Sequence, residues 1–556
     1  MADLSYWQRL SGQRFARRAL LRSGGIAAAG IGVAALAGCG SSGTSTGKAP
    51  AAGGSSASAG PPQKGGVLAH WSLTDPQSLD IHSVTSYVSV WPESPCYNQL
   101  LQYDPNDPDK KIIPDLADSY EVAGDGKSIV FKLHSGVKFH DGSAFTSEDV
   151  KATIDWIGNP PPKKISTRQG AVDAVDHVET PDPLTAKVIL KRPNPSLILN
   201  LATDFMAIGS QADLAKGDLG TQMNGTGPFK LKSYTRGVGT ELERNPSYWV
   251  KDRPYLDGLK FSIVPEDSTA FTNFVAGKFH RYYPVQPENM PRVEKETGGK
   301  AKATSLLSPT RDVLYFNGTR KPFNDPRVRQ AVSLAIDRQA SVQVVRAGLA
   351  AAGGYMQPGG QWAISADQLK KVPGYDKPDI AEAKKLLAAA GVTEPLNGVL
   401  LTRTDLAYQA TATFVQGSLQ KALGWNFKID SKDSASWLVA GDATQFDLEA
   451  GPVGIELDDP DSVFSLLATT KAARNWSKIY DTEGDALFEK QSQTLDTAQR
   501  KQIVQQMELK FLNNFPTLTV FFGNLNHGIW NQVQNYKLAS SLYTNQRLED
   551  VWLSNG

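Results

Sequence analysis

The chain has 556 residues, of which 40% are hydrophobic and 21% are charged, and its formal net charge is +1. This length exceeds what one ordinary hydrophobic core holds, so it predicts two or three domains of a globular protein. The near-neutral charge argues against the basic footprint of a protein that binds nucleic acid.

Residues 1–38 have the features of a bacterial secretion signal. Arg17-Arg18 precedes a short run of apolar and small residues, which ends in Leu36-Ala-Gly-Cys39. The run is too short for a typical membrane-spanning helix. Its last four residues resemble a bacterial lipobox, which implies that the cysteine is lipidated and becomes the new N-terminus. The paired arginines leave two export routes open, the twin-arginine pathway and general secretion.

Residues 39–63 consist mainly of Gly, Ser, Ala, Thr and Pro. Such a segment cannot bury enough apolar surface to fold, so we expect a flexible tether. Cys39 is then the expected anchor, which would hold the folded part at the outer face of the bacterial cell membrane. The second cysteine, Cys96, is expected to be a lone buried thiol that serves packing, with a pairing to Cys39 as the alternative.

The first half of the folded part is expected to be rich in strands. Residues 65–71 predict a strand, 91–101 a helix, and 172–190 two short strands. Alternating apolar residues predict strands at 129–133 and 137–139. The spacing of Thr146 and Asp149 is that of a capping box, which opens a helix.

Two features near residue 140 could suggest an enzyme. His140 stands beside Asp141 in a predicted turn, but no ligand partner follows at helical spacing, so a structural histidine is expected rather than a catalytic or metal-binding one. Ser135 and Lys138 match the S-x-x-K of penicillin-recognising enzymes. The match lies between strands, however, and the accompanying S-D-N and K-T-G strings are missing.

Residues 224–249 form the most specific string of the chain. Thr226-Gly-Pro-Phe-Lys230 predicts a tight turn followed by a strand, with Gly225 as a further turn residue. A second strand is expected at 241–244, before the chain reversal of Arg244-Asn-Pro-Ser-Tyr-Trp249.

The second half alternates helices and strands. Strands are predicted at 314–317, 425–429 and 515–522, and helices at 322–338, 379–391, 411–423 and 498–514. The helix at 322–338 is amphipathic, and Arg327 and Arg329 are expected on its outer side.

The strings at 129–150, 224–249 and 322–338 together resemble the extracytoplasmic solute-binding proteins of peptide and nickel ABC importers, the family 5 proteins. The resemblance covers about residues 65–553. It implies an α/β, two-lobed periplasmic-binding-protein-like (type II) fold with a ligand cleft between the lobes.

The implied domains are a signal peptide (1–38), the lipid-anchored tether (39–63) and two lobes. Lobe I would comprise 64–313 and 523–556, with an extra subdomain within about 100–230, and lobe II would comprise 314–522. The first lobe is thus split, and two backbone crossings form the hinge.

The resemblance also implies the ligand-binding residues. Peptide-binding relatives carry a Trp and an amine-binding Asp where this chain has Val453 and Glu456, so Glu456 could hold an amine or be a solvated loop acid. Arg403 stands where dipeptide-binding relatives bind a carboxylate, although a surface arginine is the alternative. The other expected site residues are Gly454 beside Val453, Ser86 and Tyr87 in a loop along the ligand, and Trp437 as cleft wall or core.

The function implied is capture of a short peptide and its delivery to the membrane subunits of an ABC permease, without cofactor or catalysis. An oligosaccharide or a metal chelate is the alternative cargo. The seven histidines are scattered, which argues against direct binding of a metal by several histidines. A secreted hydrolase is the contrasting class, but the sequence contains no H-E-x-x-H string and shows no credible catalytic triad.

Overall fold

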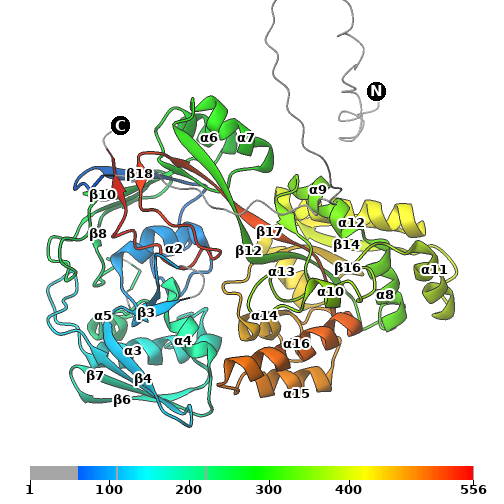
Figure 1. The fold of residues 1–556 in the computed structure, drawn as a ribbon, viewed down its shortest axis with the longest axis horizontal. Helices are drawn as coiled ribbons and strands as arrows, with labels where there is room; N and C mark the ends of the chain where they lie inside the picture. The colour runs from blue at the N-terminus through cyan, green and yellow to red at the C-terminus, as the bar shows by residue number, and fades with distance from the viewer. Residues whose placement is uncertain (1–59, 108–110, 218, 221, 555–556) are drawn as a thin grey trace, which may run out of the picture. The chain divides into compact units, whose positions relative to one another are not determined.

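The computed structural model describes residues 60–107, 111–217, 219–220 and 222–554 (Figure 1). The predicted signal peptide, Cys39 and most of the tether lie outside these residues. Among the described residues, none of the helices combines the length and the apolar character needed to cross a membrane.

An 11-stranded mixed sheet runs through both halves of the described chain. In order across the sheet, its strands are β15 (Asn426–Lys432), β14 (Asn397–Arg403), β16 (Leu448–Val453), β12 (Ala301–Phe316), β17 (Thr517–Trp530), β11 (Arg281–Tyr282), β1 (Val67–Ser72), β10 (Gly258–Ile263), β9 (Gly239–Arg244) and β8 (Phe229–Thr235), with β13 (Ala350–Ala351) beside β17.

The strands β12 and β17 connect the two ends of this sheet. They pair antiparallel from Ala301 opposite Trp530 to Tyr315 opposite Thr517, and Figure 1 shows them side by side between the half that holds β10 and the half that holds β14. The pairing is irregular after Leu307, where three residues on β12 lie opposite Gly523 alone. One of the three is Pro309, which has no N–H to donate to a ladder. The two chain crossings therefore form one paired ribbon of two strands, whose ladder is interrupted near its middle.

A smaller four-stranded antiparallel sheet belongs to the first half of the chain. Its order is β4 (Ala117–Val122), β5 (Ser128–Leu133), β7 (Thr185–Leu190) and β6 (Val175–Asp182). The helix α3 (Ser147–Gly158) packs on it and begins with the predicted capping box, in which the Asp149 carboxylate accepts the Thr146 N–H at 2.8 Å. The loop that holds His140 contacts the loop that precedes β8. The His140 ring lies 3.1 Å from the Gly227 carbonyl and 3.3 Å from the Met223 carbonyl.

The second half of the chain surrounds β14, β15 and β16 with helices. These are α8 (Pro326–Ala335), α9 (Arg338–Arg346), α11 (Ile380–Ala389), α12 (Leu406–Leu423), α13 (Ser434–Asp442), α14 (Pro460–Leu467), α15 (Thr482–Gln491) and α16 (Thr497–Asn514). The largest apolar core draws all its buried members from residues 313–521. The other large cores draw nearly all of theirs from before 304 or after 530. The fold is thus the expected two-lobed α/β fold, while the predicted lobe boundaries stay a prediction.

Several sequence-based boundaries were wrong. The helix expected at 91–101 is α2 (Tyr87–Glu93) followed by a 3₁₀ turn, because the chain becomes extended at Tyr97. Residues 137–139 form no strand and share only an isolated bridge between Lys138 and Ala144. The helix expected at 322–338 is the shorter α8, which ends where the chain becomes extended at Ile336, and a new helix, α9, begins after its cap Asp337.

The predicted place of Arg329 was also wrong. Arg327 is exposed and pairs with Asp325, as expected for the outer side of α8. Arg329 is buried instead, and it donates hydrogen bonds to the carbonyls of Phe323, Asn514 and Phe515. The guanidinium satisfies the carbonyls at the end of α16 and that of Phe323 in a place where a buried apolar side chain would otherwise be expected, and a hydrophobic pattern cannot reveal this.

Gly225 and Gly227 are required by close packing rather than by an unusual backbone conformation. A Cβ at Gly225 would lie 2.0 Å from the Cys96 carbonyl oxygen, and a Cβ at Gly227 would lie 2.4 Å from the Cys96 carbonyl carbon. The Gly227 N–H donates to that same carbonyl at 3.0 Å. The turn before β8 therefore rests directly on the backbone at Cys96, whose thiol is buried and free, and burial raises the pKa of that thiol.

We expect Gly227→Ala to lower the free energy of unfolding by about 1–3 kcal/mol, because the added methyl group must displace backbone atoms. Urea unfolding measures this change. The matched control is Gly417→Ala in α12, where the methyl group would meet nothing within 4 Å. An unchanged stability of Gly227→Ala would contradict the packing account.

Candidate functional site

A cavity of about 610 Å³ lies where the two lobes meet. Its volume falls within the ordinary range of pockets for small ligands, about 300–1,000 Å³. Residues from the first lobe, the second lobe and the C-terminal segment line it, among them Ile198, Leu199, Gln357, Trp362, Asp458, Asp459, Arg500, Ser541 and Thr544.

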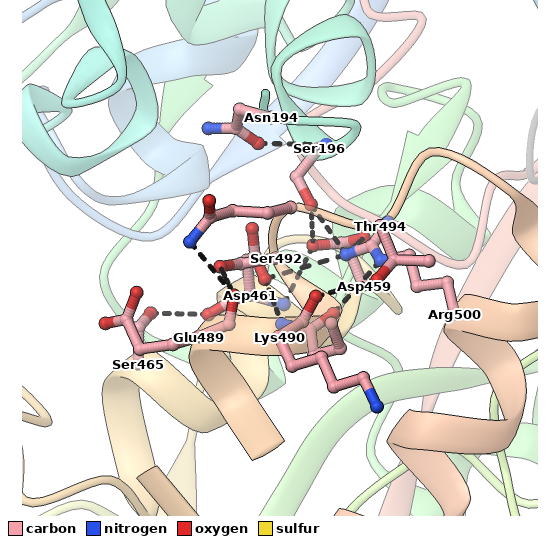
Figure 2. Close-up of polar contacts among 12 residues, drawn as sticks. Asn194, Ser196, Asp459, Asp461, Ser465, Glu489, Lys490, Ser492, Thr494 and Arg500 are labelled. Atoms are coloured by element: carbon pink, nitrogen blue, oxygen red, sulfur yellow. Dashed lines mark hydrogen bonds and ion pairs between the residues drawn. The ribbon is translucent and has the colours of Figure 1, made fainter. Parts of the chain in front are cut away.

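A buried polar contact joins the lobes at one wall of this cavity (Figure 2). Ser196, at the start of α4 (Ser196–Leu201) in the first lobe, donates its hydroxyl hydrogen to Asp459 at 2.8 Å. Arg500 of α16 donates to the same hydroxyl oxygen at 2.8 Å and to the Asp459 carboxylate at 3.2 Å. All three side chains are buried. The hydroxyl thus bridges an acid and a base of the opposite lobe.

Leu457 supports this contact with apolar packing. It belongs to the loop between β16 and α14, yet its side chain lies in the core of the small four-stranded sheet, with Leu197 and Leu201. Leu457 therefore extends from the second lobe into the core of the first.

Glu456 lies in this loop and faces the first lobe. Its Oε1 lies 2.8 Å from Nη2 of Arg168, and the Glu456 side chain keeps 36% exposure while that of Arg168 keeps 9%. Desolvation by the walls of the cleft raises the pKa of Glu456, and Arg168 offsets part of that shift. The acid is thus placed at the lobe interface, where an amine could reach it.

Val453 and Gly454 stand at the carboxyl end of β16. The Val453 side chain is buried in the second-lobe core, whereas Gly454 is exposed and has open space around its Cα. Val453 is therefore an aliphatic core residue outside the cavity lining, and ligand contact by Val453 or Gly454 stays a prediction.

Arg403 and Trp437 form a separate group in the second lobe. Arg403 lies 2.9 Å from the Asp405 carboxylate, and its guanidinium faces the rings of Tyr408 and Trp437. Trp437 is buried and donates its indole hydrogen to Glu449 at 2.9 Å. Trp437 therefore lies in the core of the second lobe, which was the alternative to a place in the cleft wall. Contact of Arg403 or Trp437 with a ligand stays a prediction.

Ser86 and Tyr87 lie at the start of α2 in the first lobe. The Tyr87 ring packs against Trp91 and Tyr283, with ring centroids 5.0 and 5.1 Å apart, and burial raises its pKa to about 12. Neither residue lines the 610 Å³ cavity. The structure thus brings Glu456 to Arg168 of the first lobe, while none of the predicted site residues lines the 610 Å³ cavity itself.

Sequence reasoning missed Ser196, Asp459, Arg500 and Arg168. Asp459 stands at an Asp-Pro step that caps α14, which marks a helix start and nothing more. The other three have no motif around them. Over the described residues, no cluster of three or more His, Cys, Asp or Glu has the geometry to hold a metal ion.

Comparison with known proteins identifies the family. The family model described as bacterial extracellular solute-binding proteins, family 5 middle, matches residues 111–475. The chain belongs to this family. Its members bind solutes rather than transform them, in agreement with the expectation of a binding protein.

Two curated relatives and one solved structure resemble this family 5 protein. The glutathione-binding protein GsiB of Pectobacterium atrosepticum is 32% identical over 351 residues, which are 62% of this chain and 65% of the relative. The di/tripeptide-binding protein 1 of Pseudomonas aeruginosa is 25% identical over 80% of this chain and 86% of its own. The solved structure is AgaA of A. tumefaciens R10 with agropinic acid, at a TM-score of 0.76 and 25% identity, covering 88% of this chain and 99% of AgaA.

We expect Ser196→Ala to favour the open form of the family 5 protein, because it removes the hydroxyl that bridges Asp459 and Arg500. The loss of one hydrogen bond to charged groups is worth about 1.5–3 kcal/mol, so the ligand-free protein should become measurably larger in small-angle X-ray scattering. The control is Ser492→Ala, a hydroxyl of the same cluster that bonds only within the second lobe. Identical scattering for wild type and both variants would contradict the role of Ser196.

Glu449 predicts a pH dependence of stability. Burial raises the pKa of this carboxyl from 4.5 to about 8, so in that window the folded chain keeps a proton that the unfolded chain releases. The free energy of unfolding should therefore fall as pH rises, by at most about 1.4 kcal/mol per pH unit from this group. Glu449→Gln should remove this contribution in urea unfolding at pH 5, 6.5 and 8. The exposed-residue control Glu489→Gln should leave it in place, and equal slopes for all three proteins would refute the assignment.

Proposed function

We propose that this chain is the lipid-anchored, extracytoplasmic substrate-binding component of an ABC importer. It captures short peptides between its two lobes and delivers them to the membrane subunits of the permease. The observation that carries the proposal is the 610 Å³ cavity at the junction of the lobes, in a chain of the family 5 solute-binding proteins. Closure of two lobes over a ligand buries most of its surface, which gives affinity without chemistry.

Two of the relatives support a peptide as the cargo. One is named as binding glutathione and the other as binding di- and tripeptides. In the proposed complex Glu456 accepts the α-amine of the peptide, because it is an acid at the lobe interface with an exposed face. Arg403 is kept as a second candidate for the carboxylate end. Lipidation of Cys39 would hold the protein at the membrane, as its Leu36-Ala-Gly-Cys39 string suggests.

A non-peptide solute is the second candidate. The likeness to AgaA, whose structure contains agropinic acid, favours it.

The test is calorimetric titration with a tripeptide pool, followed by mass spectrometry of the released ligand. We expect binding and the recovery of intact peptides. N-acetylated peptides should bind at least about tenfold more weakly, because an amine–carboxylate pair is lost. In Glu456→Gln the ratio of the affinity for free-amine peptides to that for N-acetylated peptides should fall towards one. Glu489→Gln, an exposed acid of the same lobe, should keep it.

Each failure has a separate meaning. No heat and no retained peptide would refute peptide capture. Hydrolysed peptide would refute binding without chemistry. A preference for the free amine that survives in Glu456→Gln would remove only this residue from the site.

A further inference from the structure

Arg168 presents a fixed guanidinium at the lobe interface. Its Cζ lies 3.4 Å from the centre of the Phe205 ring. Nη1 donates to the Thr167 hydroxyl at 2.8 Å and to the Thr167 carbonyl at 3.0 Å. These contacts, all within the first lobe, leave Nη2 directed at Glu456 of the second lobe. The guanidinium is therefore oriented before any partner arrives from the other lobe.

Glu456 is the carboxylate that pairs with Arg168 among the residues that the structure describes. Since the two belong to different lobes, the pair breaks when the lobes separate. Glu456, with its exposed face, then regains water, while Arg168 stays among Phe205 and Thr167. The open form therefore leaves an oriented guanidinium without its carboxylate partner, which is a site for an anion on the first lobe.

The site is within reach of a ligand in the cavity. Leu457, the neighbour of Glu456, lines that cavity. On the other side, the Tyr543 ring packs on Phe205 with centroids 4.9 Å apart, and its chain neighbours Ser541 and Thr544 line the same cavity. The guanidinium is thus connected to the cavity lining through Glu456 on one side and through Phe205 and Tyr543 on the other.

We propose that Arg168 binds a carboxylate of the ligand, and that Glu456 occupies this place when no ligand is present. A ligand that carries both charges separates the pair, with its carboxylate at Arg168 and its ammonium at Glu456. A ligand with neither charge must leave the pair intact and gains nothing from it. The inference rests on the proposed capture of peptides and narrows the cargo to those with a carboxylate that can reach the first lobe.

The pairing makes Glu456 a competitor for the ligand's carboxylate. Its removal should therefore strengthen the binding of a ligand that has a carboxylate but no free amine. A purely structural role for Arg168 predicts no such gain, so this is the readout that separates the two.

The experiment uses the full chain and four tripeptide pools. The first pool has free termini and contains neither Asp nor Glu, and the second is the same pool with amidated C-termini. The third is amidated with one Glu in each peptide, and the fourth is the first pool with N-acetylated N-termini. Retention after desalting is measured by mass spectrometry. We expect at least about tenfold weaker retention of the second pool than of the first or the third by wild type. Retention of the first pool alone would identify the C-terminal carboxylate as the group that binds Arg168. Retention of the third pool as well would identify a side-chain carboxylate.

Arg168→Met should abolish the preference for a carboxylate, and Arg168→Lys should restore part of it. Glu456→Gln should retain the N-acetylated, free-carboxylate pool several-fold more strongly than wild type. Because the Glu456 side chain is partly exposed, we expect Glu456→Gln to fold. The test with this variant therefore does not depend on how well the Arg168 variants fold.

The outcomes separate the two proposals. Retention of none of the pools by wild type overturns peptide capture, and the Arg168 site with it. Equal retention of amidated and free pools by wild type, a preference that persists in Arg168→Met, or no gain in Glu456→Gln overturns the Arg168 site and leaves peptide capture standing.

Discussion

The pairing of β12 with β17 is the constraint on which the rest of the structure depends. These two strands carry the chain from one lobe to the other and back, and they hydrogen-bond to each other over most of their length. A paired ribbon resists stretching and twisting but can bend where its ladder is broken. The irregularity opposite Gly523, with Pro309 in it, is such a place. We expect the lobes to move about this ribbon as rigid bodies, each with its own core.

Two groups of polar contacts cross between the lobes. Ser196 with Asp459 and Arg500, and Arg168 with Glu456, are contacts between charged or hydroxyl groups that water can replace when the cleft opens. Leu457, in the first-lobe core, and Leu495, beside Gly126, add apolar contacts. Closed and open forms can then differ by only a few kcal/mol, a gap that a ligand bridging both lobes can decide. Extensive apolar burial between the lobes would lock the cleft instead.

The sequence predicted the fold well, because strand alternation and helix caps are local signals. The Thr146 capping box and the strands that follow Gly227 are where the patterns place them. The glycine at 227 was predicted for a turn, yet it is needed for contact with Cys96, a residue more than a hundred positions away. The site was less predictable because it, too, depends on contacts between residues that are far apart in the sequence. Glu456 came from a motif, whereas its partner Arg168 stands in an ordinary polar loop and meets it only through the tertiary fold.

The most direct test of the account measures the distance between the lobes. Spin labels at Asp155 of α3 and Lys490 of α15, both exposed, report this distance by double electron–electron resonance, while the buried Cys96 stays unlabelled. Addition of a saturating tripeptide pool should shift the distance distribution to one shorter, narrower population. A distribution that stays unchanged while calorimetry registers binding would show that the ligand lies outside the cleft and that the lobes do not close over it.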